Sequence, residues 1–332
     1  MQTRVPTGVA TGVGSLPGLD PAEAVTLVFG ELPDFPYLPE LPERGPGADM
    51  LGRSAALLVD LAVDLQPSGW RIVPRPGRDV RRAADYLARD LDALQEHAAQ
   101  FDGPVKVQVC GPWTLGAGIE LHRGDKLIAD PGAMHDLGQS LAEGLRAHLA
   151  DLRSRLPLAQ LVVQLDEPTL PAVLAARVPT ASGYGTLRSI SAQTAEETLR
   201  VVLAAAEDTA VVVHCCAADP PLSMVTVLGL AGFSVDLAVL GTRYDDDFGV
   251  AVESGQVLLL GVVPAIGGAP TGRVPDPSPT SVRELWSRLG FPLEQLAETV
   301  VVTPRCGLAG ASPSHARAAM AQARAMAANL LD

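Results

Sequence analysis

Two side chains that bind metals well lie two residues apart at the end of an apolar run. The apolar residues 211–213 are followed by His214, Cys215 and Cys216. Side chains alternate between the two faces of a β-strand, so a strand here would put His214 and Cys216 on one face and Cys215 on the other. A metal ion needs more ligands than these two, and other parts of the chain must supply them.

Two further candidate ligands follow other apolar segments. Asp236 ends the segment that begins at residue 233, and Cys306 comes shortly after the segment 299–304. If these segments are neighbouring parallel strands, their carboxyl ends meet at one rim. His214, Cys216, Asp236 and Cys306 would then form a nitrogen, sulfur and oxygen set that suits Zn²⁺. The alternative is that the cysteines are small buried apolar side chains.

Other polar residues also follow predicted strands. Asp166 and Glu167 end the apolar segment 161–165, where Asp166 could either face a ligand or cap the next helix. The first apolar segment breaks into a glycine-rich turn at 12–18, where backbone N–H groups could approach an anion or simply lead into a helix. No partner is evident from the sequence for four histidines, which we expect at the surface: His97, His122, His135 and His148.

Strand-length and helix-length segments alternate along the chain. Strands are expected near 8–13, 36–39, 105–110, 161–166, 211–215, 233–238, 257–262 and 299–304, and helices near 20–30, 48–66, 78–100, 132–153, 194–206 and 314–331. Short apolar strands separated by helices predict a buried parallel sheet. Eight of them predict an α/β protein, a single-domain (β/α)8 TIM barrel over residues 1–332. An open doubly wound sheet is the alternative, although its Gly-x-Gly-x-x-Gly turn is missing after the first strand. The glycine-rich stretch 267–272 is a candidate lid or a simple connector.

Composition narrows the class of partner. The net charge is −13 and no block of lysine and arginine is present, which argues against nucleic acid and against an anionic membrane surface. No signal peptide or membrane-length apolar run is seen, and four cysteines are too few for a disulfide framework. We therefore expect a cytoplasmic protein with reduced or metal-bound thiols that acts on small molecules.

Five short motifs together resemble the catalytic domain of cobalamin-independent methionine synthase, within the wider barrel superfamily that includes uroporphyrinogen decarboxylase. They are Val-Gly-Ser-Leu-Pro at 13–17, Gly-Pro-Trp-Thr at 111–114, Gln-Leu-Asp-Glu-Pro at 164–168, His-x-Cys at 214–216 and Arg-Cys-Gly-Leu at 305–308. They occur in the order of the family, and each lies at the end of a predicted strand. The resemblance spans nearly the whole chain.

The resemblance implies an S-methyltransferase that uses one Zn²⁺ and methylates the thiol of homocysteine to give methionine. Carried over by position, the metal ligands are His214, Cys216 and Cys306, with Asp236 where the family has glutamate. Substrate is held by Asp166 and by the residues Val13, Gly14 and Ser15. A family glutamate that binds the substrate amine corresponds to Glu40, with Glu43 as its rival.

The methyl donor stays open in this comparison. The Leu-Gly-Ala-Gly-Ile-Glu stretch at 115–120 lacks the Asn-Trp pair that helps the long enzymes of the family to hold folate. The donor is therefore methyltetrahydrofolate, or a methylcorrinoid as in the short single-barrel relatives, with a corrinoid protein as the partner in the second case. The alternatives to a methyltransferase are a zinc-binding and amino-acid-binding barrel without turnover and, less in keeping with the thiols, a uroporphyrinogen decarboxylase-like enzyme.

Overall fold

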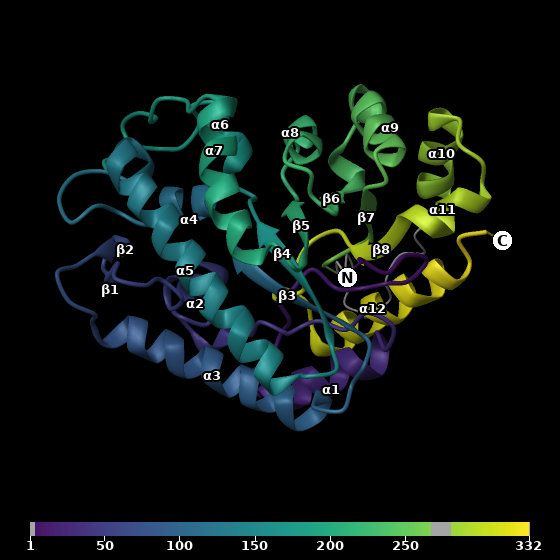
Figure 1. Cartoon of the computed structure of the whole chain (residues 1–332), viewed down its shortest axis with the longest axis horizontal. Helices are drawn as coiled ribbons and strands as arrows, with labels where there is room; N and C mark the ends of the chain where they lie inside the picture. The colour runs from purple at the N-terminus through teal and green to yellow at the C-terminus, as the bar shows by residue number, and fades with distance from the viewer. Residues whose placement is uncertain (1–3, 267–279, 332) are drawn as a thin grey trace.

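A six-stranded parallel sheet forms the centre of the molecule. The computed structural model describes residues 4–266 and 280–331, so the lid candidate at 267–272 lies outside the described residues. Each strand pairs with the next strand along the chain (Figure 1). The strands are β3 (Pro104–Cys110), β4 (Gln160–Asp166), β5 (Ala210–Cys215), β6 (Gly232–Asp236), β7 (Val257–Val263) and β8 (Val300–Pro304).

Two extended segments connect the edges of this sheet. The segment 8–16 bonds to β8, where the N–H of Gly8 donates to the carbonyl of Val300 at 2.8 Å. The segment 36–40 bonds to β3, where the N–H of Leu38 donates to the carbonyl of Lys106 at 2.9 Å. The two segments also bond to each other, with an isolated bridge between residues 15 and 40. The sheet is therefore curled, and its edges are joined through these two segments.

The predicted parallel α/β fold is confirmed for the last six expected strands. The first two expected strands, 8–13 and 36–39, are extended chain with isolated bridges instead of regular strands. Pro36 and Pro39 explain this for the second segment, because proline has no N–H to give to a ladder of hydrogen bonds.

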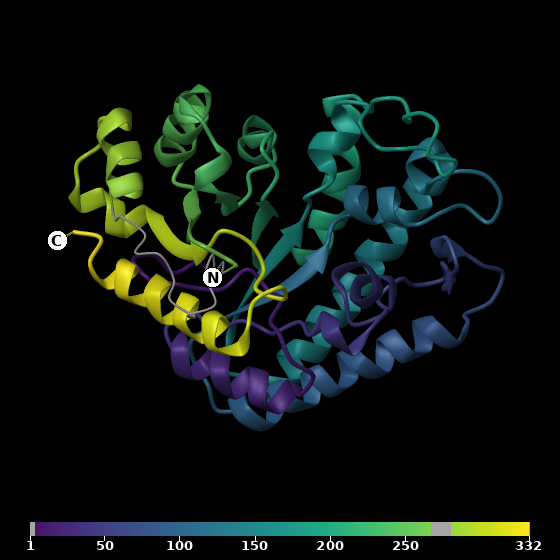
Figure 2. The same cartoon turned by 180° about the vertical axis from the view of Figure 1, so that it is seen from behind.

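Helices cover the outer face of the sheet. They are α1 (Pro21–Glu31), α2 (Met50–Ala55), α3 (Arg78–Ala98), α4 (Pro112–Gly118), α5 (Pro131–Arg155), α6 (Leu170–Leu174), α7 (Ala192–Leu203), α8 (Leu222–Val227), α9 (Asp245–Glu253), α10 (Thr280–Leu289), α11 (Glu294–Thr299) and α12 (Pro313–Ala328). Figures 1 and 2 show α1 lying between α3 and α12. Helices from the beginning and the end of the chain therefore pack together, as the two bridged segments do.

The ends of the helices follow local sequence signals. The Asp20 side chain accepts a hydrogen bond from the N–H of Ala22 at 2.8 Å, which caps α1 as predicted. The cap of α7 is Ser191, whose hydroxyl accepts from the N–H of Thr194 at 3.1 Å. This helix therefore begins at Ala192, two residues before its predicted start, with Thr194 in its first turn.

A small hairpin replaces the end of one predicted helix. The helix expected over 48–66 ends at Ala55, and β1 (Val63–Gln66) pairs in antiparallel fashion with β2 (Gly69–Ile72). Gly69 has a φ of 126°, in the region that favours glycine, and it follows Pro67 and Ser68 in the tight turn.

The inner face of the sheet changes from apolar to polar along the strands. Val162, Val212, Leu259 and Val301 pack together in one buried cluster. Two residues further along β4 and β5, on the same face, come Gln164 and His214. The polar residues therefore lie toward the carboxyl ends of the strands.

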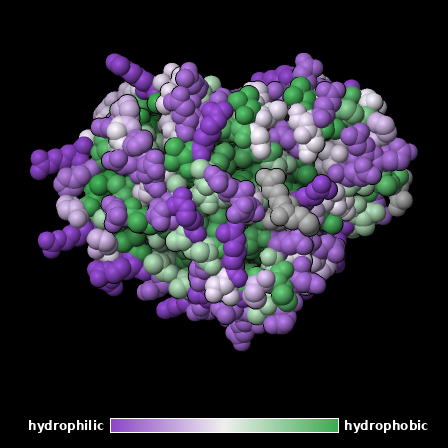
Figure 3. All heavy atoms as spheres, in the orientation of Figure 1, coloured by the Kyte–Doolittle hydropathy of each residue, from purple (hydrophilic) through white to green (hydrophobic). Residues whose placement is uncertain are grey.

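Hydrophilic side chains are spread over much of the outer surface, with apolar residues between them, on the face that Figure 3 shows. Of the helices in the described part of the chain, none combines the length and the apolar character needed to cross a membrane.

Candidate active site

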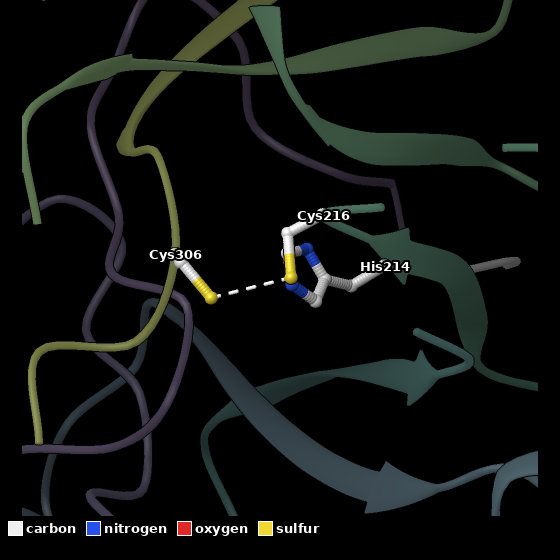
Figure 4. Close-up of side chains that lie close together, drawn as sticks. All are labelled: His214, Cys216 and Cys306. Carbon is white, nitrogen blue, oxygen red and sulfur yellow. Dashed lines mark hydrogen bonds between the residues drawn. The ribbon is translucent and has the colours of Figure 1, made fainter. Parts of the chain in front are cut away.

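Three predicted metal ligands meet at the carboxyl ends of the strands. His214 lies in β5, Cys216 follows this strand directly, and Cys306 lies in the loop after β8. One ligand atom from each lies within 4.8 Å of the others. The two sulfur atoms are 3.2 Å apart (Figure 4). Cys215 has the opposite orientation. Together with Phe233 it lines a separate apolar cavity.

The donor set of this cluster suits zinc. One imidazole and two thiolates are common Zn²⁺ ligands, and three protein ligands leave a fourth position open for a substrate. The Nδ1 atom of His214 is 3.0 Å from the hydroxyl of Ser234, which leaves Nε2 available to bind a metal ion. Serine thereby fixes the orientation of the ring, as residues behind a metal ligand commonly do.

The thiols of Cys216 and Cys306 share one hydrogen bond. Hydrogen bonds with Cys216 and His214 lower the pKa of Cys306 to about 4. The same hydrogen bond and burial raise the pKa of Cys216 well above its usual value. The pair therefore holds one thiolate readily, and a cation is needed to stabilise two.

Asp236, the fourth predicted ligand, has different contacts. Its Oδ1 atom accepts a hydrogen bond from the N–H of Ala238 at 2.9 Å, and the Nε atom of Arg305 is 4.0 Å from it. In the described residues, Asp236 is not part of the cluster of three ligands. Its ligation of the metal stays a prediction.

The predicted substrate residues line the same pocket as the three ligands. This pocket has a volume of about 280 Å³. Its lining includes Val13, Gly14, Ser15, Glu40 and Asp166 together with His214, Cys216 and Cys306. Glu43, the rival of Glu40, is exposed and does not line the pocket. The turn after the first segment and the ends of β4, β5 and β8 thus converge on one cavity.

Two carboxyl groups at the pocket are buried. Burial raises the pKa of Glu40 to about 7, although the guanidinium of Arg53 opposes this, with its Nε atom 3.8 Å from Oε1. Burial also raises the pKa of Asp166, whose Oδ1 atom accepts a hydrogen bond from Gln164 at 2.8 Å. A cationic group that enters the pocket would favour the ionised form of both carboxyl groups.

Glu167, the neighbour of Asp166, faces away from the pocket. Its carboxylate accepts hydrogen bonds from the N–H groups of Trp113 and Thr114, at 2.9 and 2.8 Å, and from the Thr114 hydroxyl at 2.7 Å. These residues open α4, whose N-cap residue Gly111 has no side chain to offer. Glu167 therefore caps α4 from the end of β4.

Two buried cations near the pocket were not identified from the sequence. Arg53 in α2 lies behind Glu40, and Lys106 in β3 is fully buried with its ammonium group directed at Gln164. The sequence did contain a signal for Lys106. Three polar residues occupy inward positions of otherwise apolar strands: Lys106, Gln108 and Gln164. The signal for Arg53 is weaker, because arginine in a short helix is usually solvated.

Comparison with known proteins agrees with this geometry. The family model of the cobalamin-independent synthase catalytic domain matches residues 6–329. A B12-independent methionine synthase from Shewanella sp. W3-18-1, solved in complex with selenomethionine, has a similar fold with a TM-score of 0.62 and 10% identity, covering 97% of each chain. Xylanase 10B from Thermotoga maritima matches with a TM-score of only 0.40 and 11% identity, over 90% of this chain and 83% of that one. No curated protein matches the chain.

Four of the five motifs contribute residues to one pocket, and Gly-Pro-Trp-Thr at 111–114 instead opens α4. Because the family model spans nearly all of the sequence, the chain belongs to the cobalamin-independent synthase catalytic-domain family.

Proposed function

We propose that this protein is a zinc-dependent methyltransferase that transfers a methyl group to the thiol of homocysteine and so forms methionine. The observation that carries this proposal is the single pocket of about 280 Å³ in which three metal-ligand side chains and two buried carboxyl groups face the same space. Family membership supports the reaction class. We also propose that segments 8–16 and 36–40 act as the first two strands of a single-domain (β/α)8 barrel, since they join β8 to β3.

In this proposal His214, Cys216 and Cys306 hold the Zn²⁺, and Asp236 is a further candidate ligand. Zinc bound there would lower the pKa of the substrate thiol, so that the sulfur reacts as a thiolate at neutral pH. Ser234 keeps the imidazole of His214 in the orientation that ligation requires.

The other end of the pocket would hold the amino-acid part of the substrate. Glu40 and Asp166 offer two carboxylates to the ammonium group of homocysteine. The backbone at Val13, Gly14 and Ser15 lines the pocket beside them and can contact the substrate carboxylate. With both ends of the substrate fixed, its sulfur is oriented toward the incoming methyl group. This positioning would contribute to the rate of methyl transfer.

A donor screen tests the reaction. Protein purified without chelator would be assayed for metal and then mixed with homocysteine and either methyltetrahydrofolate or methylcobalamin, with methionine as the readout. We expect close to one equivalent of zinc and methionine from one of the donors. A corrinoid protein is the proposed partner if methylcobalamin is the active donor.

The matched variant is Cys306→Ser, which removes a ligand without removing a buried apolar group. We expect it to stay folded by circular dichroism and to lose both zinc and activity. Zinc content below about half an equivalent in the wild-type protein, unchanged in Cys306→Ser, would contradict a zinc site built from these ligands.

A further inference from the structure

Lys106 is a buried cation directly beneath the pocket. Its side chain in β3 is 0% exposed. The ammonium group donates hydrogen bonds to the carbonyl of Val13 at 3.0 Å and to Oε1 of Gln164 at 2.7 Å. Within the described residues it forms no salt bridge. A charged group in such a place costs several kcal/mol unless its surroundings compensate, so a lysine here needs a physical reason.

The hydrogen bond from Lys106 determines which way the amide of Gln164 points. An ammonium group has only donors, so it fixes the amide oxygen on its own side and directs the amide nitrogen elsewhere. The nitrogen then donates to the carbonyl of Val13 at 2.8 Å and to Oδ1 of Asp166 at 2.8 Å. Lys106 and Gln164 therefore tie together two parts of the pocket lining, the Val13 turn and the Asp166 carboxylate.

The charge of Lys106 acts on the same two carboxyl groups. Burial lowers the pKa of Lys106 to about 7, while the charges of Asp166 and Glu40 raise it. In return, its positive charge favours the ionised forms of Asp166 and Glu40, against the effect of their own burial. The lysine thus supports the negative charge that an incoming ammonium group would meet.

We propose that Lys106 is a positioning residue that acts through Gln164 to hold Asp166 and the Val13 carbonyl in place, and that it thereby makes the pocket selective for thiols with a free α-amino group. This inference rests on the proposed function, in which Asp166 and Glu40 bind the ammonium group of homocysteine. Lys106 itself touches neither the substrate nor the metal ligands in this arrangement. Its removal should therefore affect recognition of the amine and leave the metal site intact.

The test compares two ligands in zinc-loaded full-length protein by titration calorimetry. One ligand is homocysteine, and the other is 4-mercaptobutanoate, which has the same thiol and carboxylate but no amine. For Lys106→Met we expect homocysteine to bind at least about tenfold more weakly, the effect of losing a hydrogen bond to a charged group. We expect the affinity for 4-mercaptobutanoate to change by less than about threefold and the zinc content to stay the same.

A second variant, Gln164→Leu, breaks the connection to Asp166 and leaves the lysine in place. Lys106 acts on Asp166 through Gln164, so the two substitutions interrupt the same connection. The double variant should therefore bind homocysteine about as weakly as the single variant with the lower affinity. Independent effects would instead multiply the two fold-losses in affinity. Thr303→Val is the matched control, since Thr303 is buried and its hydroxyl has no hydrogen-bond partner in the described structure. We expect normal binding of both ligands in this control.

Unchanged homocysteine binding in Lys106→Met and Gln164→Leu would overturn this inference alone. Equal weakening of both ligands would do so too, because it would indicate a general structural defect. A wild-type protein that binds zinc and fails to bind homocysteine would instead contradict the proposed function, and this inference with it.

Discussion

At the scale of single residues, strand alternation decides which thiol reaches the pocket. Cys216 lies beside Cys306 and His214, whereas Cys215 is buried in an apolar cavity on the other side of the strand. Burial raises the pKa of Cys215 to about 12, so this thiol stays protonated at neutral pH. Two adjacent cysteines therefore have different chemistry because of the direction in which each side chain leaves the backbone.

This difference predicts opposite results for two alanine variants. Cys216→Ala removes a ligand and should reduce bound zinc to below about half an equivalent. Cys215→Ala removes only a buried sulfur and should keep the zinc content of the wild type. Metal analysis of both proteins, purified side by side without chelator, measures this. Zinc loss in Cys215→Ala with retention in Cys216→Ala would reverse the assignment.

The candidate site could be predicted residue by residue where one side chain at a strand end suffices. His214, Cys216, Cys306 and Asp166 are of this kind. Lys106 could not be assigned in this way, because its role depends on contacts with residues from two other parts of the chain, Val13 and Gln164.

At the scale of the elements, β4 ends in two acids that serve different partners. Asp166 faces the pocket, and Glu167 turns outward to the first N–H groups of α4. A single strand end thus contributes both to the site and to the attachment of α4, the helix that follows the neighbouring strand β3.

The cap that Glu167 provides makes a prediction about stability. In Glu167→Gln an amide N–H₂ would face one of the N–H donors of Trp113 and Thr114, so a buried hydrogen bond is lost. We expect a loss of about 1–3 kcal/mol in the free energy of unfolding, measured by urea denaturation, with zinc content unchanged. The exposed Glu207→Gln serves as control and should change stability by less than about 0.5 kcal/mol. Equal stability of the two variants would argue against the capping role.

Six strands could be predicted closely because each is a mostly apolar run with a helix-length segment on either side. The hairpin β1–β2 was missed, since four alternating residues, 63–66, are too few to separate a strand from the end of a helix. The segments 8–13 and 36–39 were predicted as strands from their apolar content, but both form only isolated bridges, which the prolines Pro36 and Pro39 explain for the second segment.

At the scale of the whole molecule, burial shifts the pKa of some titratable groups away from their usual values. His148 in α5 was expected at the surface with three other histidines, and those three are exposed, whereas His148 is only 6% exposed. His148 lies three residues after Leu145 and four before Leu152, and both leucines are buried. Helical spacing therefore places His148 on the packed face of α5, a signal that was present in the sequence. Burial lowers the pKa of His148 from 6.5 to about 4.

This buried histidine predicts that the protein loses stability in acid. Below pH 6.5 the unfolded chain binds a proton at His148, and the folded chain does so only near pH 4. The stability that the folded protein has with His148 neutral is therefore fully present above pH 6.5. As the pH falls toward 4, the free energy of unfolding decreases by about 3 kcal/mol at most. Urea denaturation of the wild type and of His148→Gln at pH 7 and pH 5 measures the difference. Parallel pH profiles of the two proteins would contradict it.

The pocket joins the beginning of the described chain to its end. The N–H of Leu308 donates to the carbonyl of Ser15 at 2.8 Å, beside Cys306. During synthesis on the ribosome, the amino-terminal wall of the pocket therefore emerges long before its last metal ligand. The complete site can form only once Cys306 has been synthesised, and contacts between such distant segments form slowly. Loading of the proposed zinc ion should therefore follow the folding of β8, which brings Cys306 to the pocket.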